Sequence, residues 1–309
     1  MAPVLKYLIT GATGGLGKQI LSCLVDNVPA GEYAAASSNE ANRQRFEDQG
    51  IAFRVVNYDD PHTLESAFEG VENLLFVSTN TFDNEKRRKQ HQNFVDAAKK
   101  MDVKHVWYTS LAFGGLGSDS KATVQGAHLM TEDMMRQSGI NFTSVREGIY
   151  ADAFPIFMGW YPNSSSVQVP SDGPVAFTLR DELGEATARL MIRGGYDKQI
   201  VLLTAQETIT YKEIVDLINE TTGRSVRLEF VPADDFVALK VANDEGGKSE
   251  AFFQSLLTWY ESIAKGEAAI TDPLMADLLG REPVPPREAI RRLLKDRNYE
   301  WHQNYVNRG

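Results

Sequence analysis

The sequence contains almost no cysteine. Cys23 is the only one among 309 residues, so the chain cannot form an internal disulfide and has no cysteine cluster for zinc. Long apolar runs are missing too, because no stretch approaches the roughly 18–20 residues that span a bilayer. The first apolar segment, 4–9, leads directly into glycines without the small-residue cleavage site of a signal peptide. We therefore expect a cytoplasmic protein in a reducing compartment, with no membrane segment.

The chain also has fewer basic than acidic residues. The 32 lysines and arginines are outnumbered by 42 aspartates and glutamates, which gives a formal net charge of −10. A protein that binds the phosphate backbone of a nucleic acid needs a basic surface, so we expect no direct nucleic-acid partner. The five histidines show no metal-ligand spacing beyond the single pair of His128 and Glu132, so we expect no metal site. The charged run 85–89 is typical of a solvated helix face.

Short β-prone segments alternate with helical segments through the first half of the chain. Strands are expected at 4–9, 33–37, 52–56, 73–78, 104–109 and 141–145, and helices at 16–28, 40–49, 62–68, 85–101 and 122–137. Strands separated by helices pair in parallel, and right-handed crossovers then give a doubly wound sheet. The expected fold class is α/β, with a Rossmann-type doubly wound parallel sheet that the strand at 141–145 completes.

The composition of the sequence changes after Tyr150. Aromatic residues, prolines and glycines fill 154–162, and a turn-rich stretch follows to 174. Further on we expect helices at 211–221, 249–264 and 287–294, with strands near 199–203 and 226–230. The expected domains are an NAD(P)-binding Rossmann domain at 1–150 and a smaller, mostly α substrate-binding lobe at 151–309. Segments of the two are expected to interleave, so the boundary is approximate.

The most informative motif is the glycine spacing Gly11-x-x-Gly14-x-x-Gly17 directly after the first strand. Such a turn admits positive φ, lets the backbone approach a pyrophosphate, and offers it the free N–H groups of a helix N-terminus. The alternative is an ordinary tight turn, which the repeated strand and helix order makes the weaker interpretation. The expected cofactor contacts in this turn are Gly11, Thr13, Gly14, Gly15, Leu16 and Gly17.

The end of the second strand favours NADP(H) over NAD(H). Dinucleotide-binding folds often place there an acidic residue that binds the ribose 2′-hydroxyl, but here the sequence is Ala-Ala-Ser-Ser-Asn at 35–39. Ser37, Ser38, Asn39 and Arg43 can donate hydrogen bonds to a 2′-phosphate. Against this, Glu40 is only one residue further on, and Arg43 also fits a solvated helix face.

Further cofactor contacts are expected at the carboxyl ends of the later strands, where ligands bind in parallel sheets. Asn57 and Tyr58 follow the third strand, where adenine is often contacted, although an Asx turn that caps the next helix explains them equally well. After the fourth and fifth strands, the candidates are Ser78, Thr79, Asn80 and Ser110.

Four segments together resemble the NmrA-like branch of the atypical short-chain dehydrogenases/reductases over nearly the whole chain. They are GATGGLG at 11–17, the stretch from His128 through Thr131 and Glu132 to Gly148 and Tyr150, residues 209–214 with 222–224, and residues 278–283. That family includes NADPH-dependent quinone oxidoreductases and redox-sensing transcriptional co-regulators. The resemblance implies that the helix bearing His128 lies beside an NADP(H) cofactor, with Gly148 at the cofactor site and Tyr150 near the nicotinamide.

The usual proton donor of short-chain reductases is missing, because no tyrosine is followed by a lysine four residues later. His128 and Glu132 are one helical turn apart, so the imidazole can donate a proton while the carboxylate sets its tautomer. The alternative is that His128 is a hydrogen-bonded core residue. Lys121 resembles, in general location, the catalytic lysine of isoflavone-reductase-like enzymes, but it is about one turn out of register and fits a solvated lysine. Tyr150 also fits a packed aromatic.

Aromatic side chains near and beyond residue 150 are candidates for a substrate cleft. Phe113, Phe154, Phe157 and Trp160 can stack on a planar conjugated acceptor. Residues of this kind are also typical of a hydrophobic core, which we prefer for Trp259 and Tyr260.

These observations favour an NAD(P)H-dependent oxidoreductase that reduces a conjugated small molecule, such as a quinone, an enone or an imine. One alternative is a non-catalytic protein that senses the redox state of NADP and binds regulatory protein partners accordingly, which the missing Tyr-x-x-x-Lys supports. A second alternative is a non-redox isomerase or cyclase on the same fold, against which the intact glycine turn argues.

Overall fold

The computed structural model describes residues 4–81, 83–244 and 247–296, and the chain divides into two compact units. The first unit combines Met1–Ser110, Ala127–Glu147 and Arg180–Leu203, and the second combines Leu111–Gly126, Gly148–Leu179 and Thr204–Gly309. The chain therefore passes between the units several times, and one passage, from Glu147 to Gly148, is near residue 150. Residues 245–246 and 297–309 of the expected second lobe lie outside the described residues.

The first unit is built on a seven-stranded sheet with the order β3-β2-β1-β4-β5-β6-β8. Its strands are β1 (Leu5–Ile9), β2 (Tyr33–Ser37), β3 (Ala52–Val55), β4 (Val71–Phe76), β5 (His105–Leu111), β6 (Phe142–Glu147) and β8 (Gln199–Leu203). β1 pairs in parallel with both β2 and β4, so that Ile9 lies opposite Ala35 and Leu75. Every residue of β2 and β6 is buried, as expected for parallel strands that are covered on both faces. The expected Rossmann-type α/β fold is confirmed.

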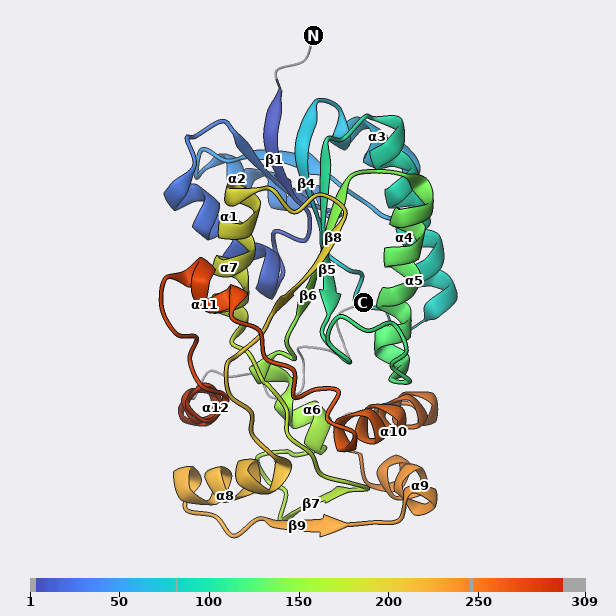
Figure 1. Cartoon of the computed structure of the whole chain (residues 1–309), viewed down its shortest axis with the longest axis vertical. Coiled ribbons are helices and arrows are strands. Elements are labelled where there is room, and N and C mark those ends of the chain that lie inside the picture. The colour runs from blue at the N-terminus through green and yellow to red at the C-terminus, as the bar shows by residue number, and fades with distance from the viewer. Residues whose placement is uncertain (1–3, 82, 245–246, 297–309) are drawn as a thin grey trace. The chain divides into compact units, whose positions relative to one another are not determined.

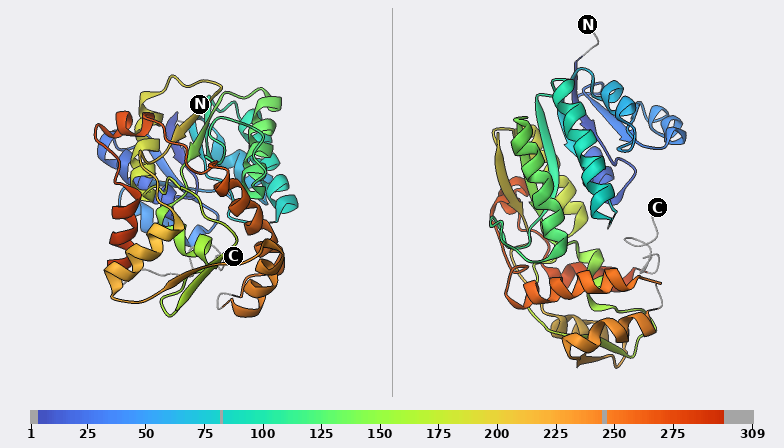
Figure 2. Two further views of the ribbon diagram at one scale, coloured as in Figure 1. Left: turned by 60° about the horizontal axis from the view of Figure 1, so that its bottom comes forward. Right: turned by 90° about the vertical axis from the view of Figure 1, so that its right-hand side faces the viewer.

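Helices cover both faces of this sheet (Figure 1). α1 (Gly15–Asn27) and α7 (Arg180–Arg193) pack against each other on one face. On the other face lie α3 (Pro61–Phe68), α4 (Asn84–Lys100) and the part of α5 (Thr123–Ser138) that belongs to this unit. Figure 2 shows α4 and α5 side by side. β2 leads to β3 through the short helices η1 (Glu40–Asn42) and α2 (Arg43–Glu47).

The prediction that the strand at 141–145 completes the sheet was wrong. β8 pairs in parallel with β6 and forms the edge of the sheet, and α7, which the sequence analysis did not predict, leads into it. A glycine in the middle of the helix, Gly184, made the pattern harder to recognise. It is there because α7 packs closely on α1: a Cβ on Gly184 would overlap the side chain of Gln19.

The second unit has its own hydrophobic core and a small parallel sheet of two strands. Its described elements are η2 (Ala151–Ala153), α6 (Phe154–Met158), β7 (Ser166–Val169), α8 (Tyr211–Thr222), β9 (Arg227–Phe230), α9 (Ala233–Asn243), α10 (Glu250–Ala264), α11 (Leu274–Leu279) and α12 (Pro286–Lys295). The stretch expected to be turn-rich contains β7, which pairs with β9. In the described parts of both units, none of the helices combines the length and apolar character that a membrane span requires.

Candidate functional site

The turn after β1 has a geometry that depends on glycine. Gly11 has φ +61°, and its carbonyl accepts a hydrogen bond from the N–H of Gly14 at 2.9 Å. A Cβ on Gly17 would overlap that carbonyl oxygen and lie 2.7 Å from its carbon, so α1 begins directly against the turn. Gly14 is the N-cap of α1 and offers no side-chain cap, which leaves the first N–H groups of this helix to an external acceptor. Thr13 is exposed, whereas Leu16 is buried and can offer a ligand only its backbone.

Arg180, the first residue of α7, brings a positive charge to this turn. A Cβ on Gly15 would overlap the Arg180 guanidinium, so the arginine side chain lies against the start of α1 within the first unit. The sequence analysis missed Arg180 because it did not predict α7. The signal was present in the two acidic residues Asp181 and Glu182, which occupy the first turn of α7 as is common at helix N-termini.

The end of β2 is held by its own hydrogen bonds. Ser37 Oγ accepts from the backbone N–H of Asn39 at 3.3 Å and from the side-chain amide of Asn42 at 3.1 Å. Asn39 in turn caps η1, because its side-chain oxygen accepts from the N–H of Ala41. Ser38 and Asn39 are exposed, so both are accessible to a ligand.

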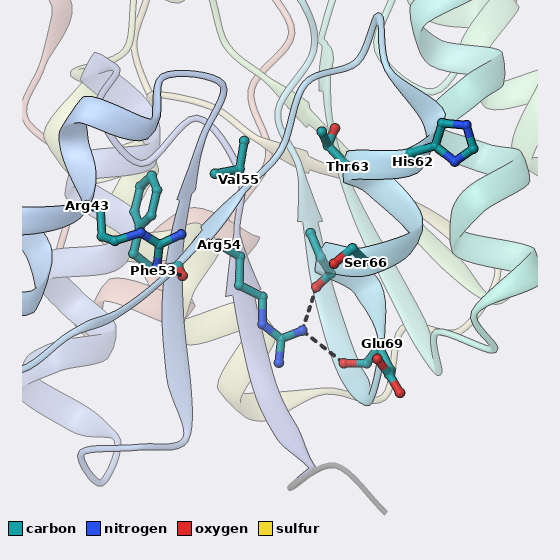
Figure 3. Close-up of a pocket in the computed structure, with 9 residues that line it drawn as sticks. Arg43, Phe53, Arg54, Val55, His62, Thr63, Ser66 and Glu69 are labelled. Carbon is teal, nitrogen blue, oxygen red and sulfur yellow. Dashed lines mark hydrogen bonds between the residues drawn. The ribbon is translucent and has the colours of Figure 1, made fainter.

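A cavity of about 530 Å³ lies along the edge strand β3 (Figure 3). Arg43 faces it and donates to Glu40 at 2.6 Å, to Glu47 at 3.2 Å and to the carbonyl of Phe53 at 3.1 Å. Arg54, also in the cavity, donates to two backbone carbonyls at the end of α3. Both guanidinium groups therefore already have protein acceptors, and the binding of a 2′-phosphate by Arg43 stays a prediction.

Asn57 and Tyr58 connect the ends of three strands. The side chain of Asn57 accepts from the N–H of Asp59 at 3.0 Å, which is the Asx turn expected as one of the two interpretations. The Tyr58 hydroxyl lies 2.9 Å from Thr10 Oγ1 and donates to the carbonyl of Val77 at 2.9 Å, and burial raises its pKa. These contacts explain both residues structurally, and an adenine contact stays a prediction.

Polar side chains gather beyond the carboxyl end of β4 and along β5. Arg87, in the first turn of α4, donates to Ser78 Oγ at 2.6 Å. The Tyr108 hydroxyl lies 3.4 Å from the same Ser78 oxygen and 3.0 Å from Nδ1 of His128. We call Ser78, Arg87, Tyr108 and His128 the tyrosine–histidine cluster. Arg87 is only 7% exposed, so the expectation that 85–89 forms a solvated helix face was wrong at this residue.

His91 of α4 links the loop after β4 to α5. Its Nε2 accepts from the backbone N–H of Thr79 at 3.2 Å, and its Nδ1 lies 2.7 Å from Thr131 Oγ1. The bond to Thr79 fixes the loop after β4, and the bond to Thr131 joins α4 to α5. Asn80, the next candidate of that loop, is exposed.

Glu132 does not orient His128, contrary to the sequence-based hypothesis. Its carboxylate accepts from Ser110 at 2.8 Å, from Ser144 at 2.7 Å and from Arg146 Nε and Nη2 at 2.9 and 2.7 Å. Arg146 and Glu132 are almost completely buried. A buried guanidinium without a paired carboxylate would be strongly destabilising, whereas a neutral imidazole has no charge to compensate. Ser110 is therefore bonded to Glu132, and the partner of His128 is Tyr108.

The surroundings keep both histidines neutral. Burial lowers the pKa of His91 to about 3. Burial also lowers the pKa of His128 well below its ordinary value, and Arg87, His91 and Arg146 act in the same direction. The Tyr108 phenol stays protonated because burial raises its pKa, although Arg87 and Ser78 oppose that shift. At neutral pH the cluster therefore contains a neutral phenol and a neutral imidazole.

The other candidates belong to the second unit. Lys121 is exposed, and Tyr150 is half-buried against the core of that unit. Gly148 packs closely, since a Cβ there would overlap Thr178 Oγ1. The expected substrate residues Phe113, Phe154, Phe157 and Trp160 are buried members of the same core. Their roles toward a cofactor or a substrate stay predictions.

Residues 5–270 match the model of the NmrA-like family. The chain belongs to the NmrA-like family. It is 54% identical over 305 residues to an NmrA-like family domain-containing oxidoreductase of Aspergillus flavus, which covers 98% of this chain and 99% of the relative. It is 28% identical to quinone oxidoreductase 2 of Escherichia coli, over 94% of this chain and 99% of the relative.

Solved structures with the same fold include two reductases. The triphenylmethane reductase of Citrobacter sp. is 30% identical with a TM-score of 0.81, covering 94% of this chain and 100% of that one. The NADPH-dependent quinone oxidoreductase of Escherichia coli, solved with NADPH, is 27% identical with a TM-score of 0.82 and the same coverage.

In this NmrA-like protein, one unit brings together most of the predicted cofactor contacts and one predicted catalytic residue. The glycine turn, the ends of β2 and β4, and His128 all belong to the first unit, whereas Lys121, Gly148 and Tyr150 belong to the second. The described residues contain no group of three or more side chains that could hold a metal ion. Besides Arg180, the sequence analysis missed Arg87 and Tyr108, which carry no motif and gain their positions only through the packing of α4 on β5.

Proposed function

We propose that this NmrA-like protein is an NADPH-dependent oxidoreductase that reduces a conjugated small molecule. The observation that carries the proposal is the turn after β1, where Gly11 takes a positive φ and Gly17 leaves no room for a side chain. A dinucleotide needs this close approach of backbone to pyrophosphate. The relatives named above include a quinone oxidoreductase and a triphenylmethane reductase, which supports a planar, conjugated acceptor.

The residues of the first unit fit a dinucleotide phosphate. The uncapped N–H groups at the start of α1 would donate hydrogen bonds to the pyrophosphate, and the Arg180 guanidinium beside them would neutralise its charge. The exposed Ser38 and Asn39 would donate to a 2′-phosphate, and no carboxylate at 35–39 repels it. When bound, the nicotinamide would supply a hydride to the acceptor. A reducing, cytoplasmic compartment suits this chemistry and the single cysteine.

Calorimetric titration with NADPH, NADP⁺, NADH and NAD⁺ tests cofactor binding, and Gly14→Asp makes the test specific to the turn. Gly14 has φ −82° and ψ 169°, which any residue adopts, and aspartate is a favoured N-cap. A Cβ there would lie 3.3 Å from the carbonyl oxygen of Gly11, a tight contact that a shift of a few tenths of an ångström relieves, so the variant should fold. Its carboxylate would occupy the N–H groups and repel the pyrophosphate. We expect the affinity for NADPH to fall by about 100-fold, which is about 2.7 kcal/mol.

The matched control is Gly126→Asp, which adds the same charge at an exposed position of α5 with nothing within 4 Å of its Cβ. It should leave NADPH binding unchanged. Tight NADPH binding by the native chain, followed by oxidation of NADPH with a benzoquinone, an enone or a triphenylmethane dye, would support the proposal. If none of the four nucleotides binds, the proposal fails and the non-redox alternative remains.

The absence of Tyr-x-x-x-Lys favours a second candidate function, that of a nucleotide-dependent regulatory protein. Such a protein would bind NADP⁺ or NADPH tightly, show no turnover with any acceptor of the panel, and bind a protein partner in only one redox state of the nucleotide. Turnover with any acceptor at a rate that the Gly14→Asp variant abolishes would exclude this purely binding role.

A further inference from the structure

Arg87 is a buried cation without a counter-ion. It is 7% exposed, and its guanidinium donates only to neutral oxygens, Ser78 Oγ at 2.6 Å and the carbonyl of Thr81 at 2.7 Å. Among the residues that the structure describes, no carboxylate pairs with it. A buried charge of this kind is costly unless a negative charge compensates it at some stage. The ionisable group that shares Ser78 with Arg87 is the phenol of Tyr108.

His128 continues the chain of polar contacts. Its Nδ1 lies 3.0 Å from the Tyr108 hydroxyl, and its side chain is half-buried. Within the described part of the chain, its Nε2 has no hydrogen-bond partner. Tyr108 has one proton to give, and the imidazole nitrogen at 3.0 Å is both closer and a stronger acceptor than Ser78 Oγ at 3.4 Å, which already accepts from Arg87. The phenol would be the donor in the contact with Ser78 Oγ as well, and because its single proton can serve only one acceptor, we assign that proton to the shorter contact with Nδ1. The imidazole proton then lies on Nε2.

We propose that the tyrosine–histidine cluster is the proton donor of the reductase, with His128 as the catalytic residue that touches the acceptor, and Tyr108 and Arg87 acting through it. This proposal rests on the proposed function and supplies the acid that the missing Tyr-x-x-x-Lys leaves open. Its distinctive feature is that arginine, across a serine, takes the place of the lysine that assists the tyrosine of ordinary short-chain reductases.

The proton and electron balance of the step is simple. A neutral acceptor such as a quinone or an enone would gain a hydride from NADPH and become an anion, which leaves the nucleotide as NADP⁺. The Nε2–H bond of His128 breaks as that proton passes to the anion, and the Tyr108 O–H bond breaks as its proton passes to Nδ1. The imidazole stays neutral with its proton on Nδ1, and the phenolate of Tyr108 becomes the counter-ion of Arg87. A solvent proton then reaches Nε2 while the Nδ1 proton returns to the phenolate, which restores both groups.

The charged and titratable groups around His128 agree with a relay through a neutral imidazole. Arg87 and His91 face it from α4, Tyr108 from β5 and Arg146 from β6, while Glu132 on its own helix is paired with Arg146. Burial, Arg87, His91 and Arg146 lower the pKa of His128, so the ring does not store a proton at neutral pH. Burial raises the pKa of Tyr108, so the phenol keeps its proton until the acceptor takes one.

The test compares Tyr108→Phe and His128→Gln with Tyr33→Phe, in the full-length chain. Tyr33 is a buried tyrosine of β2 whose hydroxyl has no hydrogen bond to any described residue, so its variant controls for the loss of a buried phenol. With a quinone or an enone as the acceptor, we expect both cluster variants to lower kcat by about 100-fold, as for the loss of a general acid, with KM for NADPH within about twofold of the native value. Tyr33→Phe should change neither constant.

The pH profile separates a proton relay from a structural role. In the native enzyme, kcat should not vary between about pH 6 and 8.5, because neither Tyr108 nor His128 changes its protonation in that range. In both cluster variants the proton must come from solvent, so log kcat should fall as pH rises. Arg87→Lys should keep more activity than Arg87→Met, because a lysine can still compensate the phenolate.

One further readout needs no turnover. The ¹⁵N shifts of the His128 ring should show a neutral imidazole with its proton on Nε2, and Tyr108→Phe should change that pattern. A proton on Nδ1, or cluster variants with native kcat and a flat pH profile, would overturn the relay while leaving the reductase standing. No turnover by the native chain with any acceptor would overturn the proposed function and the relay together.

Discussion

A single arginine outside every sequence motif should set much of the affinity for the nucleotide. Arg180 lies against Gly15 at the start of α1, where the pyrophosphate is proposed to bind. We expect Arg180→Met to weaken NADPH binding by about tenfold, or about 1.4 kcal/mol, since it removes one charge-assisted contact and keeps the apolar length of the side chain. Calorimetry at low and high salt measures this, and the loss should shrink as salt screens the native interaction.

The matched control for that variant is Arg189→Met on the same helix. Arg189 pairs with Glu185 on the surface, and its removal should leave NADPH binding unchanged. Equal effects of the two substitutions would mean that Arg180 acts only through the overall charge of the chain.

At the scale of elements, the buried pair of Glu132 and Arg146 joins α5 to β6. Burial by itself raises the pKa of Glu132, but the hydrogen bonds and charge of Arg146, with Ser144 and Ser110, lower it below its ordinary value. Glu132→Gln removes the carboxylate that pairs with the buried Arg146 guanidinium, so we expect the free energy of unfolding to fall by about 3–5 kcal/mol in urea denaturation. Glu185→Gln, which removes the half-buried partner of the exposed Arg189, should cost less than about 1 kcal/mol.

The same pair predicts a dependence of stability on pH. Because the pKa of Glu132 is lower in the folded chain than in the unfolded chain, its contribution is present above the unfolded value of about 4.3 and is lost as pH falls through the folded value. The native chain should lose this contribution on acidification and Glu132→Gln should not, so the difference between their unfolding free energies should narrow below about pH 4. A gap that stays constant to lower pH would contradict the assignment.

Elements with a strong local signal were predictable from the sequence, and elements defined by packing were not. The strand β2 was predicted at its observed bounds, and α8 to within one residue, because the apolar pattern of each segment is a local feature of the sequence. α7 was missed because its central glycine, Gly184, is explained only by the close packing of α7 on α1. For the site, the glycine turn was readable as a spacing, whereas the contact of Tyr108 with His128 depends on the register of β5 and α5, which no short motif records.

At the scale of the whole molecule, the division into two units makes the location of nucleotide binding testable. All groups proposed to hold the dinucleotide phosphates lie in the first unit, in the turn after β1, at the end of β2 and at Arg180. We expect saturating NADPH to slow amide hydrogen exchange in residues 11–18 and 36–39, while β7 and β9 of the second unit keep their native rates. At a ligand concentration of about 100 times Kd, binding adds about 2.7 kcal/mol to the free energy of unfolding of the first unit, which gives a readily measured change in its exchange rates.

Gly14→Asp should abolish the protection by NADPH, and Gly126→Asp should preserve it. Protection confined to the second unit would mean that the nucleotide does not bind at the turn after β1. The hydride would then also be supplied elsewhere, and the tyrosine–histidine cluster could not act as its proton donor.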